Sequence, residues 1–136
     1  MNTQNLDYLL NDFIDRVPDV THVLTVSADG LLIACNDELP QEDADRLAAI
    51  ASGLVSLLAG AARALQADPV ISCMAELYGG YMFSMSIPGG ASLLALASYD
   101  CDIGQVGHEL ADLINKIGPS ISPELRGQVT GANQGR

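Results

Sequence analysis

The sequence of 136 residues predicts an α+β fold, in which helices pack against an antiparallel sheet. Three observations predict this fold. An Asp-Gly turn joins two short apolar runs, two glycine turns join three further runs, and apolar residues recur at helical spacing in the segments around them. We therefore expect a single domain with the order helix, two strands, long helix, three strands, helix.

The N-terminal part of the chain predicts a helix and a hairpin. Apolar residues at intervals of three or four predict a helix over residues 4–16, which Pro18 closes. The apolar runs His22–Ser27 and Leu31–Asn36 predict two strands. The segment between them, Ala28-Asp29-Gly30, is typical of a hairpin turn.

Three further runs predict an antiparallel meander, namely Val70–Leu77, Tyr81–Ile87 and Ser92–Tyr99. They are joined by the turns Gly79-Gly80 and Pro88-Gly89-Gly90. The last run is almost continuously apolar. This pattern is typical of a strand that is covered on both faces, and it predicts a central position in the sheet.

The C-terminal part predicts a closing helix that starts at Ile103, with Asp102 as its N-cap and Gly118-Pro119 as its end. We expect residues 1–126 to form the domain. The polar residues 127–136 are expected to form a flexible tail.

The long central helix is the most informative element, because Leu47–Ala62 holds no charged residue in a chain of formal net charge -11. We expect it to begin near Pro40 and to end before Asp68-Pro69. One side carries the larger residues Leu47, Ile50, Leu54, Leu58, Ala61 and Leu65. The other side carries the small residues Ala49, Ser52, Gly53, Ser56, Ala59 and Gly60. A helix that is apolar all round is buried all round, so we expect the larger side to face the core and the small side to face a second molecule.

Charges at the two ends of the small side favour a second copy of the chain. In an antiparallel pair, Arg63 of one copy would lie near Glu42 and Asp45 of the other. Small residues would let the two backbones approach closely, while the charges would fix the register. Cover by another part of the same chain remains an alternative. A membrane span is disfavoured, since sixteen residues reach about 24 Å against a hydrocarbon core of roughly 30 Å.

Composition limits the class of partner. Six basic residues against seventeen acidic ones leave no basic footprint for nucleic acid and would repel an anionic membrane surface. We therefore expect a protein partner, no nucleic acid and no direct membrane insertion. The absence of an N-terminal apolar run predicts a cytoplasmic protein. The three cysteines Cys35, Cys73 and Cys101 are widely spaced without a CxxC pair, so we expect them to be reduced.

The chemistry of the side chains predicts neither an enzyme nor a metal or cofactor site. A phosphate-binding GxxxxGK[ST] loop is absent, and Lys116 is the only lysine. Neither GxSxG nor HExxH occurs. The two histidines, His22 and His108, are interpreted as a strand residue and a helix-surface residue rather than as catalytic bases.

The order of these motifs resembles the Roadblock family, which includes dynein light chains and MglB-like regulators of bacterial GTPases. The resemblance covers residues 5–118. It rests on the Ser27–Gly30 hairpin, the helix rich in Ala, Leu and Gly, and the Ile103-Gly104 entry to the last helix. The sequences of these motifs are most similar to those of actinobacterial members, which are encoded beside a sensor-kinase-like protein and a small Ras-like GTPase.

The resemblance implies a five-stranded antiparallel sheet in the order 2-1-5-4-3, with the long helix on one face and the two terminal helices on the other. It also implies a homodimer formed through the long helix and the third strand. Ile71, Cys73 and Ala75 of that strand thereby join the expected interface.

The implied function is that of a non-catalytic regulator or scaffold of a small Ras-like GTPase in bacterial signalling. Arg46 is a candidate contact for that partner, although a salt bridge in the dimer interface is the more ordinary role for both Arg46 and Arg63. The alternative is a sensory domain that binds a small molecule. The two hypotheses differ in whether a set of large side chains fills the core or interface, or lines a cavity. This set is Met74, Tyr81, Met82, Phe83 and Met85.

Overall fold

The structure, a computed structural model, describes the backbone of residues 3–133 and the side chains of residues 5–121. The eight elements are α1 (Thr3–Arg16), β1 (Val20–Val26), β2 (Leu32–Cys35), α2 (Gln41–Ala64), β3 (Ser72–Leu77), β4 (Gly80–Ser86), β5 (Ser92–Ser98) and α3 (Ile103–Asn133). Their order is the one that the sequence predicts.

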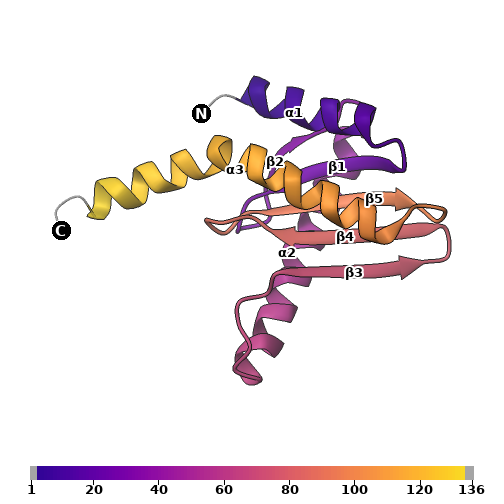
Figure 1. The fold of residues 1–136 in the computed structure, drawn as a ribbon. Helices are drawn as coiled ribbons and strands as arrows, with labels where there is room; N and C mark the ends of the chain where they lie inside the picture. The colour runs from indigo at the N-terminus through magenta and orange to yellow at the C-terminus, as the bar shows by residue number, and fades with distance from the viewer. Residues whose placement is uncertain (1–2, 134–136) are drawn as a thin grey trace.

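The five strands form one antiparallel sheet in the order β2-β1-β5-β4-β3 (Figure 1), which confirms the expected topology. The turn between β1 and β2 contains Gly30 at φ +85°, a backbone conformation that glycine adopts without strain. The central strand β5 is the almost continuously apolar one. Four of its residues in succession, Ser92–Ala95, are buried, because helices cover both faces of the sheet at this position.

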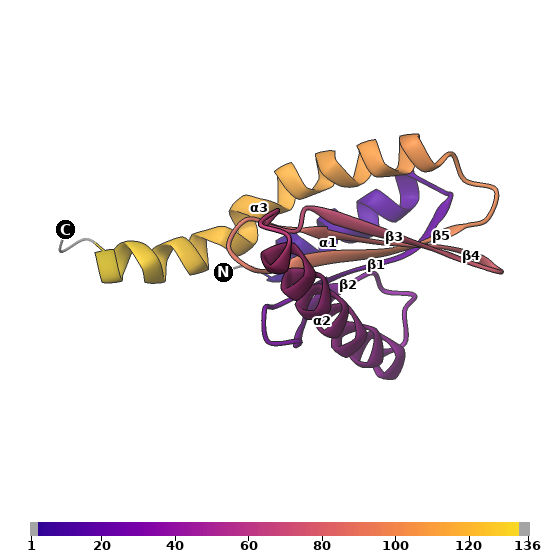
Figure 2. The same ribbon diagram turned by 90° about the horizontal axis from the view of Figure 1, so that it is seen from below.

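The two terminal helices α1 and α3 lie on the same face of the sheet (Figure 2). Their apolar stripes meet inward-facing strand residues in the larger of two buried clusters. Phe13 of α1, Leu110 of α3 and Leu93 of β5 are examples, each at most 1% exposed. The covering of this face by α1 and α3 fits the expected arrangement of layers.

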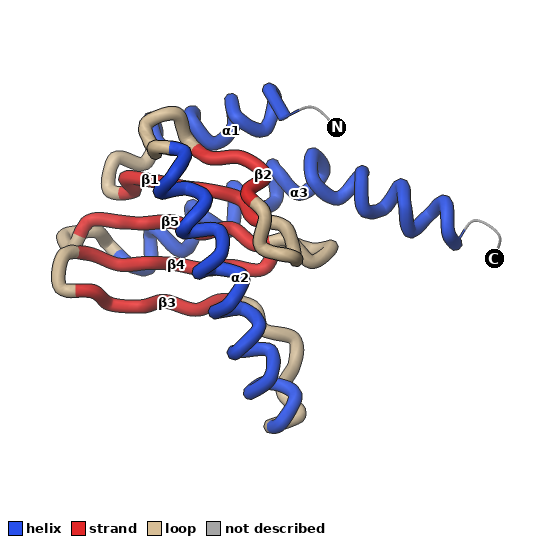
Figure 3. The backbone as a smooth tube through the Cα atoms, turned by 180° about the vertical axis from the view of Figure 1, so that it is seen from behind, coloured by secondary structure: helices blue, strands red, loops and turns tan. Residues whose placement is uncertain are grey.

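The long helix α2 lies on the opposite face (Figure 3) and meets the sheet through alanines. Ala44, Ala48 and Ala51 are buried against Leu24 and Leu94. Side chains this small allow α2 to lie close to the strands, which explains why alanines occupy the buried positions of the helix.

The expected division of α2 into a core-facing large side and a partner-facing small side is therefore partly wrong. Of the larger residues, Leu47 packs against the core, but Ile50 and Leu65 are 48% and 77% exposed. The periodicity identified an apolar helix, but it could not identify which side approaches the sheet.

The last helix also differs from the prediction, because α3 continues through Gly118-Pro119 to Asn133. Proline removes one helical hydrogen bond and crowds the preceding turn, so it can bend a helix without ending it. Figure 2 shows such a change of direction in α3. Of the tail expected at residues 127–136, residues 127–133 are helical, and 134–136 lie outside the described residues. The flexibility of this segment stays a prediction.

The helix in the structure is longer than the sixteen uncharged residues, so its length does not exclude a membrane span. At 24 residues, α2 reaches about 36 Å, and it is the one helix in the described range that is long and apolar enough to cross a membrane. Length and composition alone are weak support for a span, since core helices of globular domains pass the same test. The N-terminal half of α2 has such a role, because its alanines are buried against the sheet.

Candidate protein interface

The outward face of α2 is apolar although nothing in the described chain covers it. Ile50 and Leu57 project from this face with 48% and 77% of their surfaces exposed. Gly53 lies between them, and a Cβ added there would meet no atom within 4 Å. Exposed apolar side chains that share one helix face favour contact with another macromolecule.

The C-terminal half of α2 also extends past the sheet. The buried alanines all belong to the N-terminal half, where α2 packs on β1, β2 and β5. Figures 1 and 3 show the remaining turns continuing beyond the β3 edge. Residues 61 and 63–69, at the end of α2 and after it, are exposed. This half of α2 is therefore less covered by its own domain than the N-terminal half, and an apolar helix with so much exposed surface favours a further contact.

Strand β3 forms one edge of the sheet and carries no proline that would prevent a further strand from pairing with it. Cys73 is paired with Ser84 of β4, and Ala75 is paired with Met82. Because Met82 packs in the cluster beneath α2, Cys73 and Ala75 face the same side of the sheet as α2. Ile71, which precedes the strand, is 70% exposed.

The structure distributes the predicted interface residues between exposed and half-buried positions. The exposed ones are Glu42, Asp45, Ala49, Gly53, Ser56, Arg63 and Ile71. The half-buried ones are Ser52, Ala59, Gly60, Cys73 and Ala75. Ala49, Gly53 and Ser56 are thus available to a partner, whereas Ser52 lies against the chain's own hairpin turn, close to Gly30.

The charged residues of α2 are arranged at its two ends. Arg46, the candidate partner contact, is paired with Glu42 at 3.7 Å and with Asp43 at 3.6 Å on its own helix. Its side chain is 63% exposed, so these pairs contribute little to stability and leave the guanidinium accessible. Asp45 accepts a hydrogen bond from Gln41. Arg63 makes no ion pair within the described part of the chain.

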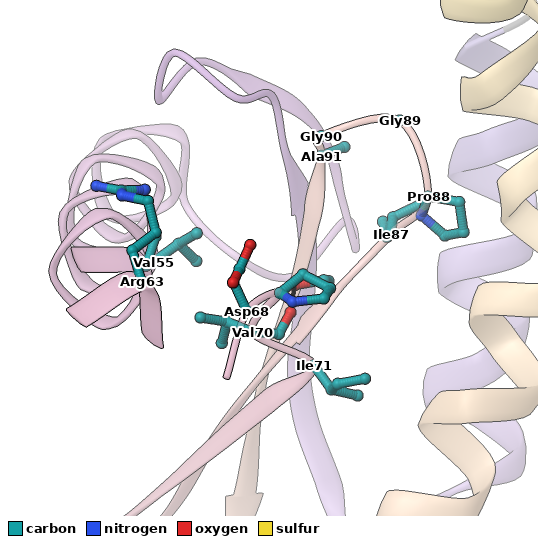
Figure 4. A pocket seen from close by; sticks show the side chains of 13 residues that line it. Val55, Arg63, Asp68, Val70, Ile71, Ile87, Pro88, Gly89, Gly90 and Ala91 are labelled. Carbon is teal, nitrogen blue, oxygen red and sulfur yellow. Dashed lines mark hydrogen bonds between the residues drawn. The ribbon is translucent and has the colours of Figure 1, made fainter. Parts of the chain in front are cut away.

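A groove of about 540 Å³ lies between the C-terminal half of α2 and the sheet (Figure 4). Val55, Ala59 and Arg63 of α2 form one wall. The opposite wall consists of the segment before β3, including Val70 and Ile71, and of the turn from Ile87 to Ala91. The groove is mostly apolar, with Arg63 and Asp68 as its charged residues.

The sequence reasoning missed Leu57. It belongs to neither of the two sides assigned to the long helix, yet it is the most exposed large apolar residue within α2. Leu57 follows Gly53 by four positions, so a partner that contacts the glycine would also contact Leu57. That spacing was the available signal.

The residues that distinguish the two functional hypotheses lie mainly in the core. Phe83, Tyr81 and Met85 belong to the cluster under α1 and α3, while Met82 packs in the cluster under α2. Met74 is 44% exposed on the β3 edge. The groove beside α2 and three other surface hollows are lined by none of these five side chains.

Titratable groups in the described residues form no evident reactive set. Among these residues, no group of three His, Cys, Asp or Glu side chains could hold a metal ion. His108 lies 3.5 Å from Asp112 on the surface of α3. The half-buried thiols Cys35 and Cys101 have raised pKa values because burial disfavours the thiolate and nearby carboxylates add to the effect.

Comparison with known proteins agrees with the geometry. A family model for the Roadblock/LC7 domain matches residues 6–97. A crystal structure of a Roadblock/LC7 domain from Streptomyces avermitilis is 31% identical, with a TM-score of 0.80, over 85% of this chain and 97% of that one. A second such domain from that organism is 34% identical, with a TM-score of 0.69, over 82% and 97% of the two chains. Myxococcus xanthus MglB, 14% identical, shares the fold with a TM-score of 0.81 over 91% and 92%. A search of curated proteins gives no match.

These features define the class of small α/β/α sandwich with an apolar helix that extends past the β3 edge of its sheet. The chain belongs to the Roadblock/LC7 family.

Proposed function

We propose that the protein is a homodimer whose subunits join through α2 and the β3 edge. The observation that carries the proposal is the overhang of α2, whose outward and C-terminal surfaces hold Ile50, Leu57 and Leu65 in exposed positions. A dimer would remove this apolar surface from water at about 25 cal/mol per Å².

The overhang also suggests how two copies fit together. If two β3 strands pair edge to edge, each α2 extends toward the partner's half of the joint sheet. There it would cover the α2-side face of β3, where Cys73, Ala75 and Leu77 lie. The pairing would satisfy the free backbone groups of two edge strands at once. In an antiparallel arrangement of the helices, Arg63 would approach Glu42 and Asp45 of the other copy.

The paired helices then serve as a docking platform for a small Ras-like GTPase in bacterial signalling, inside the cytoplasm. Membership of the Roadblock/LC7 family supports this role, as does the fold shared with MglB, named as a gliding protein in its Thermus thermophilus form. The protein acts as a non-catalytic regulator or scaffold. Arg46 contacts the GTPase, because its side chain is exposed near the N-terminus of α2 and its ion pairs are weak.

Binding to a GTPase tests this role directly. The full-length protein is immobilised and exposed to a small Ras-like GTPase encoded in the same genome, loaded with GDP or with a non-hydrolysable GTP analogue. We expect binding in at least one nucleotide state. Failure in both states would contradict the role and favour the sensory alternative.

A charge-reversal variant tests whether Arg46 contacts the GTPase. Arg46→Glu should weaken GTPase binding by roughly tenfold, since it replaces an attraction by a repulsion. It should leave the dimer intact. Lys116→Glu is the matched control, because Lys116 lies exposed on α3 and the change in net charge is the same. Equal effects of the two variants would exclude a specific contact at Arg46.

The sensory alternative rests on the groove beside α2, whose apolar walls and volume of about 540 Å³ fall in the range of small-molecule sites. Ala59→Trp would fill this groove. If the protein binds a small apolar ligand there, the variant abolishes ligand-induced thermal stabilisation of the wild-type protein. The regulator hypothesis predicts no such ligand.

A further inference from the structure

A second distinctive surface lies at the end of the sheet where the β3–β4 turn and the start of α3 are found (Figure 1). We call it the tyrosine–glutamate patch, formed by Glu76 of β3, Tyr81 of β4 and Tyr99 after β5. The rings of Tyr81 and Tyr99 are stacked, with centroids 5.5 Å apart and an interplanar angle of 8°. The hydroxyl of Tyr99 donates a hydrogen bond to the Glu76 carboxylate at 3.3 Å.

The patch is open to solvent. Tyr99 is 52% exposed even though Tyr81 covers one face of its ring. Glu76 is exposed, and it lines a shallow hollow together with Leu77, Tyr78 and Tyr99. Tyr78, at the hairpin turn, is fully exposed. An aromatic platform beside a carboxylate is therefore presented at the surface, without a covering element in the described chain.

The surroundings of the patch are acidic. Partial burial raises the pKa of Tyr81, and the negative charge of Glu76 raises it further. The neighbouring Cys101 has a raised pKa through burial and through Asp19, Asp102 and Asp100. None of the charged groups that act on these two side chains is a cation.

Two arginines of the described residues are paired with acids away from the patch. Arg16 is paired with Asp12 and Glu109, and Arg46 is paired with acids of its own helix. Glu76 makes no salt bridge within the described part of the chain; its recorded partner is the Tyr99 hydroxyl. The formal net charge of -11 adds a long-range attraction for cations.

We propose that the tyrosine–glutamate patch binds an arginine side chain presented by a basic segment of a partner protein. A guanidinium group is planar, so it stacks on the open face of Tyr99, and its forked N–H groups donate to the Glu76 carboxylate. A lysine ammonium would satisfy the charge but not the stacking. The exposed ring of Tyr78 receives the aliphatic part of the segment.

Although Glu76 belongs to β3, its side chain lies on the face of the sheet away from the α2 helices of the proposed dimer. Glu76 is paired with Tyr81, and Tyr81 packs in the cluster under α1 and α3, so the patch lies on the face of the sheet opposite to α2. Both copies of a dimer would present it. Loss of arginine binding would therefore leave the dimer and its GTPase contact unaffected.

Titration of the full-length protein with a short arginine–glycine peptide tests the proposal, followed by amide chemical shifts. We expect saturable shifts at Glu76, Tyr78 and Tyr99. The matched lysine–glycine peptide should bind roughly two- to fivefold more weakly, because stacking on an exposed ring contributes about 0.5–1 kcal/mol. No shifts at the patch, or equal affinity for the two peptides, would overturn the proposal.

Two variants separate the patch from the overall charge. Glu76→Gln should weaken arginine-peptide binding roughly two- to fivefold, and Tyr99→Leu should do the same by removing the platform. Glu38→Gln is the matched control, since Glu38 is also exposed and its loss changes the net charge equally. Equal weakening by Glu38→Gln and Glu76→Gln would show binding by charge alone and overturn the proposal. Glu76→Gln alters one exposed side chain, so its amide spectrum should remain that of the folded protein.

Discussion

Ala48 and Leu57 lie on opposite faces of α2, with 1% and 77% of their surfaces exposed. Nine positions separate them, which is about two and a half helical turns. The smaller side chain faces the sheet and the larger faces solvent. This inversion of the usual order fits the proposal that α2 contacts both the core of its own domain and a second copy of the chain.

A larger side chain in place of an alanine between α2 and the sheet should destabilise the protein. Ala48→Leu should lower the free energy of unfolding by about 1–3 kcal/mol, because the added carbon atoms must displace the helix from β1 and β5. Ala111→Leu, at an exposed position of α3, should change it by less than about 0.5 kcal/mol. Urea unfolding followed by circular dichroism measures both, and a smaller loss for Ala48→Leu than for Ala111→Leu would contradict the packing described.

Replacement by alanine should affect stability differently at two adjacent glycines of the β3–β4 hairpin, Gly79 in the turn and Gly80 at the start of β4. A Cβ at Gly80 would collide with the backbone carbonyl oxygen of Ala97, whereas a Cβ at Gly79 would meet no atom within 4 Å. Gly80→Ala should therefore destabilise the protein by more than about 2 kcal/mol. Gly79→Ala should be neutral within about 1 kcal/mol. Thermal unfolding of the two variants is the measurement, and similar midpoints would refute the close approach of β4 to β5.

Asn36 ties the end of β2 to β1, since its side-chain Oδ1 accepts a hydrogen bond from the Val23 amide at 2.9 Å. Asn36 is 1% exposed, so Asn36→Ala leaves a buried N–H without its partner. We expect a loss of about 1–3 kcal/mol in the free energy of unfolding. The exposed Asn115→Ala serves as the control. Faster amide hydrogen exchange at Val23 should accompany the loss, and unchanged exchange there would argue against the bond.

The raised pKa values of Cys35 and Cys101 predict slow alkylation. Burial disfavours the thiolate, so at a given pH less of the reactive form is present than in the unfolded chain. Both thiols should react with iodoacetamide several-fold more slowly in the folded protein, and the rates should rise as the pH passes the ordinary thiol pKa. Because the folded pKa is the higher one, the neutral thiols contribute stability below the unfolded pKa that is lost as the pH rises through the folded pKa. Equal rates in buffer and in urea would contradict the burial.

Element types were predictable because turn chemistry and periodicity act locally. Asp29-Gly30 and Gly79 each lie in a turn between strands that the structure contains, while Gly80 is the first residue of β4. The central place of β5 followed from its continuous apolar run, while the strand order came from the family resemblance. The predicted end of α3 was wrong, because a proline can bend a helix without ending it.

The faces of α2 could be predicted only in part. Helical spacing places Ala44, Ala48 and Ala51 together, but it does not reveal that the sheet requires a close approach at this position. Hydrophobicity therefore assigned Ile50 and Leu65 to the core, where the structure leaves them exposed. The interface residues are defined by contacts with a second molecule. The structure of one chain does not contain those contacts, so these residues stay a prediction from the sequence.

Sedimentation of the purified protein at micromolar concentration tests the central claim most directly. We predict a dimer for the wild type and a folded monomer for Gly53→Arg, because the added side chain finds open space in one chain but occupies the proposed seam between two. Gly107→Arg, which also enters open space but lies on α3, should remain a dimer. A monomeric wild type, or a Gly53→Arg variant that stays dimeric, would contradict the account.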